Sequence, residues 1–584
     1  MSMTDQMRSW QPSTVLTFWA IAVGAWATAA VALGVRAWSW ATHTPAPANP
    51  ARVAALIVRG GLEPTAGMWA WVGMAALVLA AAPVVVVRLV RHGRAARRRG
   101  DEAARLTGRR GDTESLNEKA VRAKAERLGA GTSSSQNGSF GLPIGRAVAD
   151  GRRLWTSFED VCIMIAGPRT GKTTCWVVPR IRAAPGFVLA TSNKPDVLEA
   201  TRRVRARRGD VWVFDPQGIA DEPQSWWWNI LSYVTDAVQA RALTQIFIDT
   251  TRDAKAQTSA YFDSAARDLV TALVLAAARG ERTIMEVHGW LADQTNREPL
   301  IILRRAGEDL MAQSLEGTMN LVAETRSGVY GTASTMVSFM LNTKAMRWVT
   351  PQPLLAELRP DELVTSTDTL YCLSQEGRGD ASPIVTALTV AVTEAAVAHA
   401  RTQADGRLRV PMLIELDEAA NVCRWRELPN MYSHFGSRGI VVDTILQAWA
   451  QGVSGWGEEG IKKLWSAANQ KVYGGGVSER GFLSDLEAII GTHWVDSVQT
   501  TSSRQGSSTS RSRNAQQRQI ATVKDLAELP PGRAWVLSSG NKAVLTEMVP
   551  YWNQDRVDDT GQGTSSNSRT ATAAITTGPQ PTKK

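Results

Sequence analysis

Cysteine and histidine are both scarce in this chain of 584 residues, which holds four of the first and six of the second. The cysteines form no C-x-x-C pair, and the histidines show no metal-ligand spacing. These absences exclude a zinc module built on paired cysteines and give no support to a disulfide framework. We therefore expect the four thiols to be reduced, as in a cytosolic protein; they are Cys162, Cys175, Cys372 and Cys423.

Acidic residues are fewer than basic residues. There are 55 of them against 65 lysines and arginines, which gives a formal charge of +10 and a pI near 9.6. This balance favours an anionic partner, either nucleic acid or a lipid surface. The length exceeds that of a single ordinary core, so two or more domains are expected.

Long apolar runs, by contrast, are present near the N-terminus. Residues 15–35 and 66–87 carry no charge, and each run is long enough to cross a bilayer at about 1.5 Å per residue. Six arginines follow between positions 88 and 99, whereas residues 36–65 hold fewer basic side chains. The positive-inside rule then places both termini in the cytoplasm. A signal peptide is the alternative for the first run, but its weakly basic start and the second run disfavour it.

These patterns predict a multi-pass protein of the cell membrane whose large part after residue 87 is cytoplasmic. Topology alone explains the arginine cluster; a DNA path along the membrane surface is the alternative. The expected segments are a cytoplasmic tail at 1–14, transmembrane helices at 15–35 and 66–87, an external loop at 36–65, and a basic juxtamembrane segment and linker at 88–137.

The remainder has the alternating pattern of an α/β fold, in which short apolar runs are separated by helical stretches. A helix-rich region at 241–355 predicts an all-α domain inserted between two parts of the α/β domain, 138–240 and 356–552. Residues 500–519 are expected to be a mobile polar loop, and 553–584 a disordered tail. The expected strands are Val161–Ile165, Gly186–Ala190, Val211–Phe214, Thr369–Leu373, Pro411–Leu416, Ile440–Leu446, Lys471–Tyr473 and Ala534–Leu537.

A phosphate-loop pattern follows the first of these strands. The stretch IAGPRTGKTT departs from G-x-x-x-x-G-K-[ST], because Ala166 stands where the first glycine belongs and Gly167 follows it. Alanine there is a modest departure if its φ is negative. Lys172 would reach the β- and γ-phosphates, and the Thr173 hydroxyl would ligate Mg²⁺. Pro179 is expected to bend or end the helix that follows. The predicted ATP-binding residues are Gly167, Pro168, Arg169, Thr170, Gly171, Lys172, Thr173 and Thr174; a chance GKT after a strand is the alternative.

A nucleotide motor also needs a strand that ends in carboxylates, and MLIELDEAANV supplies one. Asp417 would hold the Mg²⁺ and Glu418 would act as general base toward the attacking water. A further strand ends at Gln447, which we expect to sense the γ-phosphate. Arg438 lies just before that strand, and two interpretations stay open: an arginine finger toward a neighbouring subunit, or an ordinary surface arginine.

In this order the motifs resemble the type IV coupling proteins of conjugation, of the TraG/TraD type, including their TraM-recognition region. The loop GPRTGKTT…VVP is similar to the family's loop, which itself varies at the first glycine. The two apolar runs are similar to the family's anchor. Other blocks resemble the family's in the same order: FGLPIGR, ATSNKPDVLEATRRVRARRGDVWVFDP, WWWNIL, DEAANV, GSRGI…LQAWAQ, NQKVYGGG and LPPGRAWVLSSGNKAVLTEMVPYW.

The resemblance implies a RecA-like P-loop motor domain with an inserted all-α domain, preceded by two transmembrane helices and assembled as a homo-hexamer at the membrane. It implies that ATP and Mg²⁺ drive transfer of DNA, single-stranded with covalently attached relaxase, and that relaxosome proteins and type IV secretion channel components are partners. Two alternatives stay open. An FtsK/SpoIIIE-like pump of double-stranded DNA usually ends in a winged-helix reader, where this chain has a low-complexity tail. A receptor for protein substrates is compatible with the same site.

Overall fold

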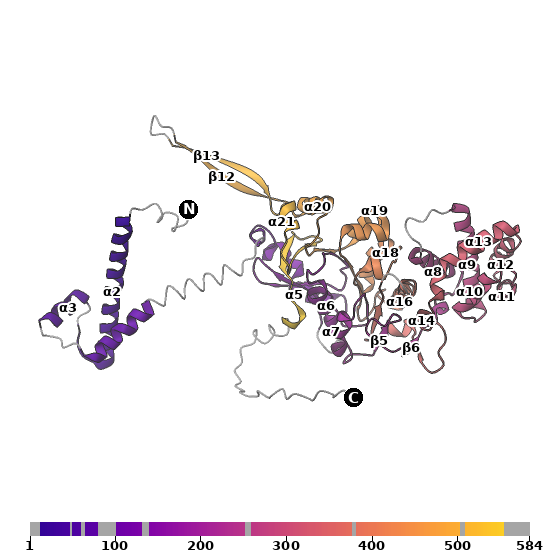
Figure 1. Cartoon of the computed structure of the whole chain (residues 1–584), viewed down its shortest axis with the longest axis horizontal. Helices are drawn as coiled ribbons and strands as arrows, with labels where there is room; N and C mark the ends of the chain where they lie inside the picture. Colours follow the sequence, from indigo (N-terminus) through magenta and orange to yellow (C-terminus); the bar gives the residue numbers. More distant parts are fainter. Residues whose placement is uncertain are drawn as a thin grey trace, which may run out of the picture. The chain divides into compact units, whose positions relative to one another are not determined.

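The computed structural model describes residues 12–46, 49–59, 65–79, 101–130, 139–251, 259–375, 381–502 and 509–553. They form two compact units, residues 1–98 and residues 99–584, which are drawn in Figure 1. Nearly all of the predicted C-terminal tail at 553–584, and the arginine cluster at 88–99, lie outside the described residues.

The first unit contains helix α2 (Pro12–Thr42), helix α3 (Pro50–Val58) and a helix at Ala66–Leu79. The backbone of Gly34 packs against Val72, since a Cβ at Gly34 would lie 2.7 Å from the Val72 nitrogen. The expected external loop is therefore partly helical, because α2 runs on to Thr42 and α3 follows it.

The two predicted membrane spans are not confirmed. Among the described residues, one helix has the length and apolarity of a span, α16 (Ser382–Thr402), and 78% of its apolar window is buried within the second unit. That burial is typical of a core helix. The second predicted span is described as helix only as far as Leu79.

The second unit is built on a mixed sheet of eleven strands in the order β2-β1-β15-β14-β11-β3-β10-β9-β4-β8-β5. The strands from β11 to β5 run parallel to their neighbours, whereas those from β2 to β11 pair antiparallel. All eight expected strands are present. Their bounds and those of the remaining strands are β1 Leu142–Ala147, β2 Arg153–Thr156, β3 Cys162–Ile165, β4 Val188–Ser192, β5 Val211–Phe214, β8 Thr369–Leu373, β9 Met412–Leu416, β10 Ile440–Leu446, β11 Gln470–Tyr473, β14 Arg533–Ser538 and β15 Val544–Glu547.

Both faces of the parallel strands are buried, which explains why their sequences are continuously apolar. In β3, Ile163 and Ile165 join one hydrophobic cluster, and Cys162 and Met164 join the cluster on the other face. Helices cover the two faces: α6 Val178–Ala183, α7 Asp196–Arg205, α16, α17 Ala419–Val422, α18 Leu428–Phe435, α19 Trp449–Ala467, α20 Arg480–Ile490 and α21 Val523–Ala527.

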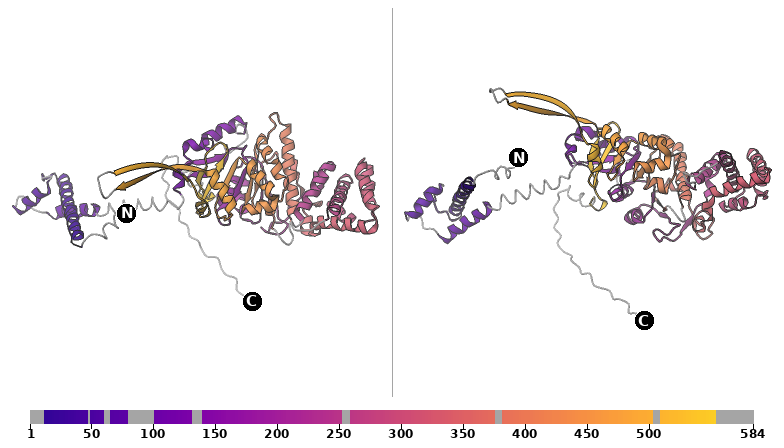
Figure 2. Two further views of the ribbon diagram at one scale, coloured as in Figure 1. Left: turned by 90° about the horizontal axis from the view of Figure 1, so that it is seen from above. Right: turned by 45° about the horizontal axis from the view of Figure 1, so that its top comes forward.

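Between β5 and β8 the chain forms a group of helices that gathers at one end of the unit in all views (Figure 1, Figure 2). Helix α9 is its buried centre, with all residues from Leu269 to Ala277 inside. Two strands of two residues, β6 Trp226–Trp227 and β7 Ala356–Glu357, pair where the helical group leaves and rejoins the α/β domain. The helices are α8 Ala237–Thr251, α9 Ala260–Arg279, α10 Ile284–Ala292, α11 Glu298–Arg305, α12 Asp309–Met319, α13 Ala323–Met336, α14 Thr343–Met346 and α15 Pro360–Leu363.

The predicted linker at 88–137 is wrong for its central part. Residues 101–130 contain α5 (Glu118–Arg127) and pack on the end of the sheet. The Arg533 guanidinium donates to both oxygens of Asp101, at 2.8 and 3.0 Å, and the Thr107 hydroxyl donates to the Ala543 carbonyl at 2.8 Å. Its charged composition resembles a linker, but these long-range contacts cannot be read from sequence.

The predicted mobile loop at 500–519 is also wrong for the described residues. Strands β12 (Thr492–Ser502) and β13 (Thr509–Gln519) pair antiparallel over eleven positions without a register shift. The pair extends away from the sheet in Figure 1 and Figure 2. Threonine, serine and valine recur along β12, and a two-stranded ribbon of this kind satisfies backbone groups without an apolar core.

Candidate nucleotide site at the carboxyl ends of the central strands

The phosphate-loop residues lie between the carboxyl end of β3 and the following helix. Gly171 has φ +95°, and Arg169 has φ +60°. Ala166 is fully buried and its φ is not positive. An alanine can therefore replace the usual first glycine without backbone strain. The first turn is closed instead by Gly167, whose amide donates to the Gly475 carbonyl at 2.8 Å.

The helix after the loop begins with a wide turn, a π-helical segment from Thr173 to Val177 in which the Val178 amide donates to the Thr173 carbonyl. Pro179 then lies in the first turn of α6, which continues to Ala183. Pro179 therefore does not end the helix, and the regular α-helical turn is replaced by a wider one just before it. A proline ring ordinarily clashes with the carbonyl four residues earlier, and the wider turn relieves this clash.

Lys172 is folded back over the loop. Its side chain is 8% exposed, and its Nζ donates to the carbonyl oxygens of Ala166 at 2.8 Å and Gly167 at 3.1 Å. Burial lowers the pKa of Lys172, while the nearby charges of Asp417 and Glu418 oppose that shift. The ammonium group thus lies between the loop and the two carboxylates that follow β9.

The carboxylates differ in environment. Asp417 is 5% exposed, and its Oδ1 is buried without a hydrogen-bond partner. Burial, with a smaller contribution from Glu418, raises the pKa of Asp417 to about 7, and Lys172 opposes the shift. An unsatisfied buried carboxylate oxygen costs free energy unless a cation completes the site. The residues therefore fit Mg²⁺, with Asp417 and the half-buried Thr173 hydroxyl as the oxygen ligands this metal prefers.

Glu418 has a left-handed backbone, with φ +56° and ψ +44°. A glutamate is rarely found in this region, and the strain is typical of functional turns. Gln447 at the end of β10 donates from its Nε2 to the Glu418 carboxylate. The two residues meet because β10 lies between β3 and β9 and runs parallel to both.

Arg438 does not join this group. It ends the short helical turn Gly436–Arg438, which precedes the amino end of β10. Since β3 and β10 are parallel, Arg438 lies at the edge of the sheet opposite the phosphate loop. It is half-buried, and a role toward the nucleotide of its own subunit is excluded by this position.

Sequence reasoning missed two features of the site. The first is the segment Gly474–Gly476, which follows β11 and packs its backbone against Gly167; its only sequence signal is the run of three glycines. The second is a buried ion pair beneath the loop, in which Arg180 of α6 donates to Asp443 of β10, with Nη2 to Oδ1 at 3.0 Å. Both side chains are about 1% exposed or less.

Glu415 completes this buried charge cluster. It is the register partner of Asp443 across β9 and β10. Burial, and then the charge of Asp443, raise the pKa of Glu415 well above its usual range. Asp443 is thus the polar neighbour of Glu415 in the sheet.

Comparison with known proteins gives a family match and a shared fold. Residues 411–531 match the family model described as the TraM recognition site of TraD and TraG. This match includes Asp417, Glu418, Arg438 and Gln447. No curated protein sequence matches the chain.

Among solved structures, the unbound monoclinic form of the bacterial conjugative coupling protein TrwBdeltaN70 has a TM-score of 0.52 at 14% identity, covering 73% of this chain and 91% of that one. Its trigonal form in complex with sulphate has a TM-score of 0.50 at 13% identity, covering 73% and 92%. The plasmid coupling protein TrwB in complex with the ATP analogue ADPNP has a TM-score of 0.50 at 14% identity, covering 67% and 86%.

At 13–14% identity these structures show only that the fold is shared. The similarity in sequence is shown by the family model over residues 411–531. The resemblance to type IV coupling proteins of conjugation that the motifs predict is thus confirmed, by sequence over residues 411–531 and by fold across the α/β unit.

Proposed function

We propose that this chain is an ATPase that couples DNA to a conjugative type IV secretion channel. One observation carries the enzymatic part: Lys172, Asp417, Glu418 and Gln447 converge from three adjacent parallel strands. The convergence supplies a cation for the phosphates, a metal ligand, a base and a polar sensor in one place.

Each of these side chains has a role in ATP binding or hydrolysis. The loop from Gly167 to Thr174 binds the phosphates of ATP through backbone N–H groups, and Lys172 exchanges its two carbonyl partners for phosphate oxygens. Thr173 and Asp417 would hold Mg²⁺, which when bound would supply positive charge beside the phosphates. Glu418 accepts the proton of the attacking water. Gln447 holds Glu418 before the reaction and reports the γ-phosphate afterwards.

The DNA-coupling part rests on the match over residues 411–531, whose description names TraM recognition. We propose that this region meets relaxosome proteins, and that the cargo is single-stranded DNA with covalently attached relaxase. The similar structures are of a bacterial conjugative coupling protein, which favours this cargo over the double-stranded DNA of an FtsK-like pump.

Anchoring in the cell membrane is part of the proposal. It is supported by the 31-residue helix α2, which contains the first uncharged run and carries Arg36 as its one charged residue. A homo-hexameric ring is likewise proposed. In such a ring Arg438, which lies away from its own loop, would act on the nucleotide of a neighbouring subunit.

The test is the ATPase rate of the full chain in detergent or nanodiscs, with and without single- or double-stranded DNA. A fragment should begin near residue 99, because residues 101–130 pack on the sheet. Stimulation by single-stranded DNA that is lost in Lys172→Ala supports the proposal. Turnover that is indifferent to DNA refutes the DNA part and favours a receptor for protein substrates, and turnover that persists in Lys172→Ala refutes the site.

A further inference from the structure

A fourth parallel strand, β4, ends beside the nucleotide site. Strand β4 pairs with β9 and runs parallel to it, so the residues that follow the two strands reach the same edge of the sheet. The Thr191 hydroxyl donates to the Asp417 carbonyl at 3.2 Å and joins the two strand ends directly. Lys194 comes shortly after Thr191, in the turn between β4 and α7. The turn therefore lies next to the carboxylates that follow β9.

The turn that carries Lys194 is held in place by hydrogen bonds to neighbouring segments. The Lys194 amide donates to the Ser192 hydroxyl at 3.2 Å, and the Asn193 carbonyl accepts from Gln375 Nε2 at 2.9 Å. The Gln375 amide in turn donates to Gln217 Oε1 at 2.8 Å. Gln375 follows β8, and Gln217 follows β5. The backbone at Lys194 is thus fixed by the ends of adjacent strands, as a precisely placed functional group requires.

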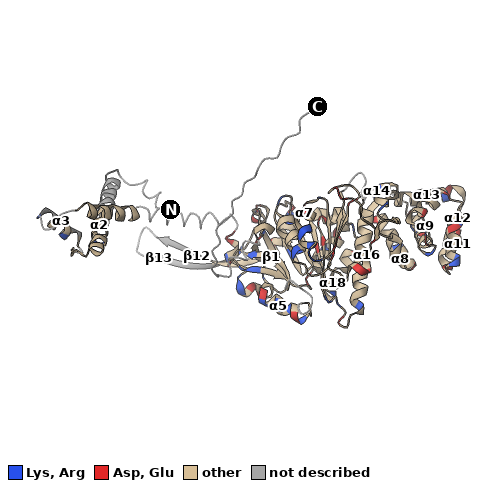
Figure 3. Cartoon of the chain, turned by 90° about the horizontal axis from the view of Figure 1, so that it is seen from below, with Lys and Arg blue, Asp and Glu red and all other residues tan. Residues whose placement is uncertain are grey.

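The Lys194 side chain has no stabilising role in the fold. It is exposed, and within the described part of the chain its ammonium group forms no ion pair and no hydrogen bond. It also lies just before the N-terminus of α7, where a cation opposes the helix dipole. The basic residues of α7 itself, blue in Figure 3, are in its last turn, where the dipole favours them. The charge of Lys194 is therefore available to a ligand.

The ammonium group of Lys172 is close enough to be repelled by that of Lys194. Burial, and to a smaller extent the charge of Lys194, lower the pKa of Lys172. The two lysines come from strands on either side of β10 and β9, because Lys172 follows β3 and Lys194 follows β4. Asp417 and Glu418 offset part of the repulsion, but the proposed function commits them to Mg²⁺ and to the attacking water. An anion between the lysines would remove the rest, and the γ-phosphate of ATP is such an anion.

We infer that Lys194 contacts the γ-phosphate of ATP from the side opposite Lys172 and stabilises the negative charge of the phosphoryl group during hydrolysis. The inference rests on the proposed function and adds to it a catalytic residue of the same subunit. In the reaction the water oxygen bonds to the γ-phosphorus, and the water proton goes to Glu418. The bond from the γ-phosphorus to the bridging oxygen breaks, and its electron pair leaves with ADP. Lys194 transfers no proton, since its fixed positive charge lies beside the non-bridging oxygens.

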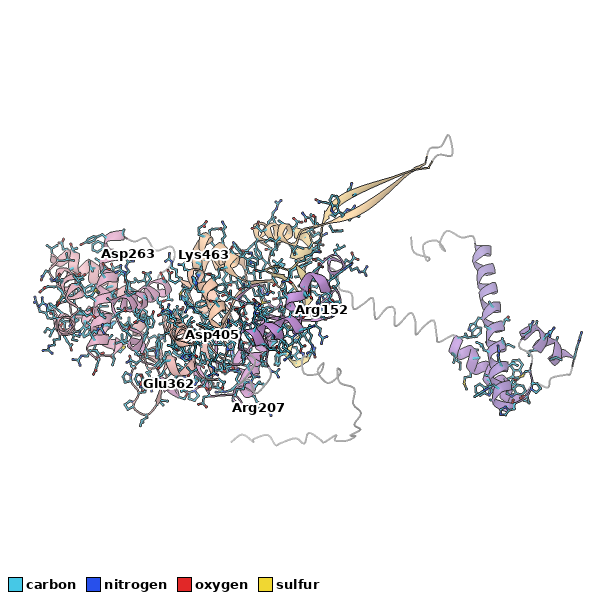
Figure 4. The ribbon with its side chains drawn as sticks, turned by 180° about the vertical axis from the view of Figure 1, so that it is seen from behind. Arg152, Arg207, Asp263, Glu362, Asp405 and Lys463 are labelled. Carbon is cyan, nitrogen blue, oxygen red and sulfur yellow. The ribbon has the colours of Figure 1, made fainter. Side chains whose placement is uncertain are left out.

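The experiment compares the affinities of ADP and of a non-hydrolysable ATP analogue for the full chain in nanodiscs, beside single-turnover hydrolysis of ATP. The variants are Lys194→Gln and Lys194→Arg. The matched control is Arg207→Gln, which removes an exposed cation just after the other end of α7 (Figure 4). For Lys194→Gln we expect analogue affinity to fall roughly tenfold, ADP affinity to stay unchanged, and the hydrolysis rate to fall about 10²–10³-fold. Lys194→Arg should recover part of both losses, because it keeps the positive charge.

ADP separates this contact from a structural role, because ADP lacks the γ-phosphate. Equal weakening of both nucleotides in Lys194→Gln overturns the inference, and so do a normal analogue affinity and a normal rate. A slower rate with unchanged analogue affinity also overturns it and shows that Lys194 acts through another residue. These outcomes leave the proposed function standing.

The thermal unfolding midpoint reports on folding. If Lys194→Gln is destabilised, Lys194→Met takes its place, since methionine keeps an apolar stem without the charge. Failure of the unmodified chain to bind either nucleotide, or turnover that persists in Lys172→Ala, overturns the proposed function and the inference with it.

Discussion

Two single substitutions, Gly167→Ala and Ala166→Gly, test how the phosphate loop keeps its conformation without the usual first glycine. A Cβ added at Gly167 would lie 2.7 Å from the carbonyl carbon and 2.9 Å from the Cα of Gly476, with the carbonyl oxygen closer still. These are backbone atoms, so one of the two segments must move. Overpacking of this kind costs about 1–3 kcal/mol, and the 2.8 Å bond from Gly167 N to Gly475 O is strained as well.

For Gly167→Ala we therefore expect ATP affinity to fall about 30-fold, which corresponds to about 2 kcal/mol. Ala166→Gly restores the usual pattern, yet it should give no gain. Ala166 is fully buried and packs toward Gly474, and glycine there costs about 0.5–1 kcal/mol of backbone entropy. The assay is titration with a fluorescent ATP analogue, beside the thermal unfolding midpoint of each variant. Normal affinity and stability in Gly167→Ala, or tighter binding in Ala166→Gly, would refute the reasoning.

Three further substitutions test the rest of the site. Glu418→Gln should bind ATP normally but hydrolyse it about 10²–10⁴-fold more slowly, because the amide cannot accept the proton of water; normal turnover in a single-turnover assay would point to another base. Arg438→Ala should lower the turnover of assembled rings by about 10³-fold or more and leave monomers unaffected, as expected of a finger acting between subunits; equal rates in rings would leave Arg438 an ordinary surface residue. Arg180→Met should cost about 3–5 kcal/mol of unfolding free energy, because Asp443 is left buried and unpaired; a loss under about 1 kcal/mol in urea unfolding would show that the ion pair does not stabilise the fold.

The sequence predicts the parallel strands well because they are buried on both faces and read as short apolar runs. Lys172, Asp417 and Gln447 are predictable for a related reason: residues just after parallel strands meet at one edge of the sheet. The antiparallel strands β1, β2 and β15 were missed, since LPIGRA and RLWT contain proline, glycine or arginine and have no apolar run.

Other parts depend on partners that are distant in the chain. Nothing local indicates that residues 101–130 pack on β14 and β15, or that Gly475 accepts the Gly167 amide. Apolar composition also cannot distinguish a buried core helix from a membrane helix: α16, inside the α/β unit, meets the criterion for a span. The continuation of helix past Pro179 is not predictable, because the wide turn that accommodates the proline leaves no pattern in the sequence.

The ion pair between Arg180 and Asp443 limits how the motor domain can move. Arg180 belongs to the helix that follows the phosphate loop, and Asp443 belongs to β10, which ends one residue before Gln447. If the helix slid along the strand, an uncompensated charge would be left in the apolar interior, at a cost of several kcal/mol. The ion pair therefore makes the phosphate loop, α6 and β10 move as one rigid body. Gain or loss of the γ-phosphate must then be transmitted by side-chain rotation at Gln447 and Glu418, or by rotation of the whole block, and not by deformation within it.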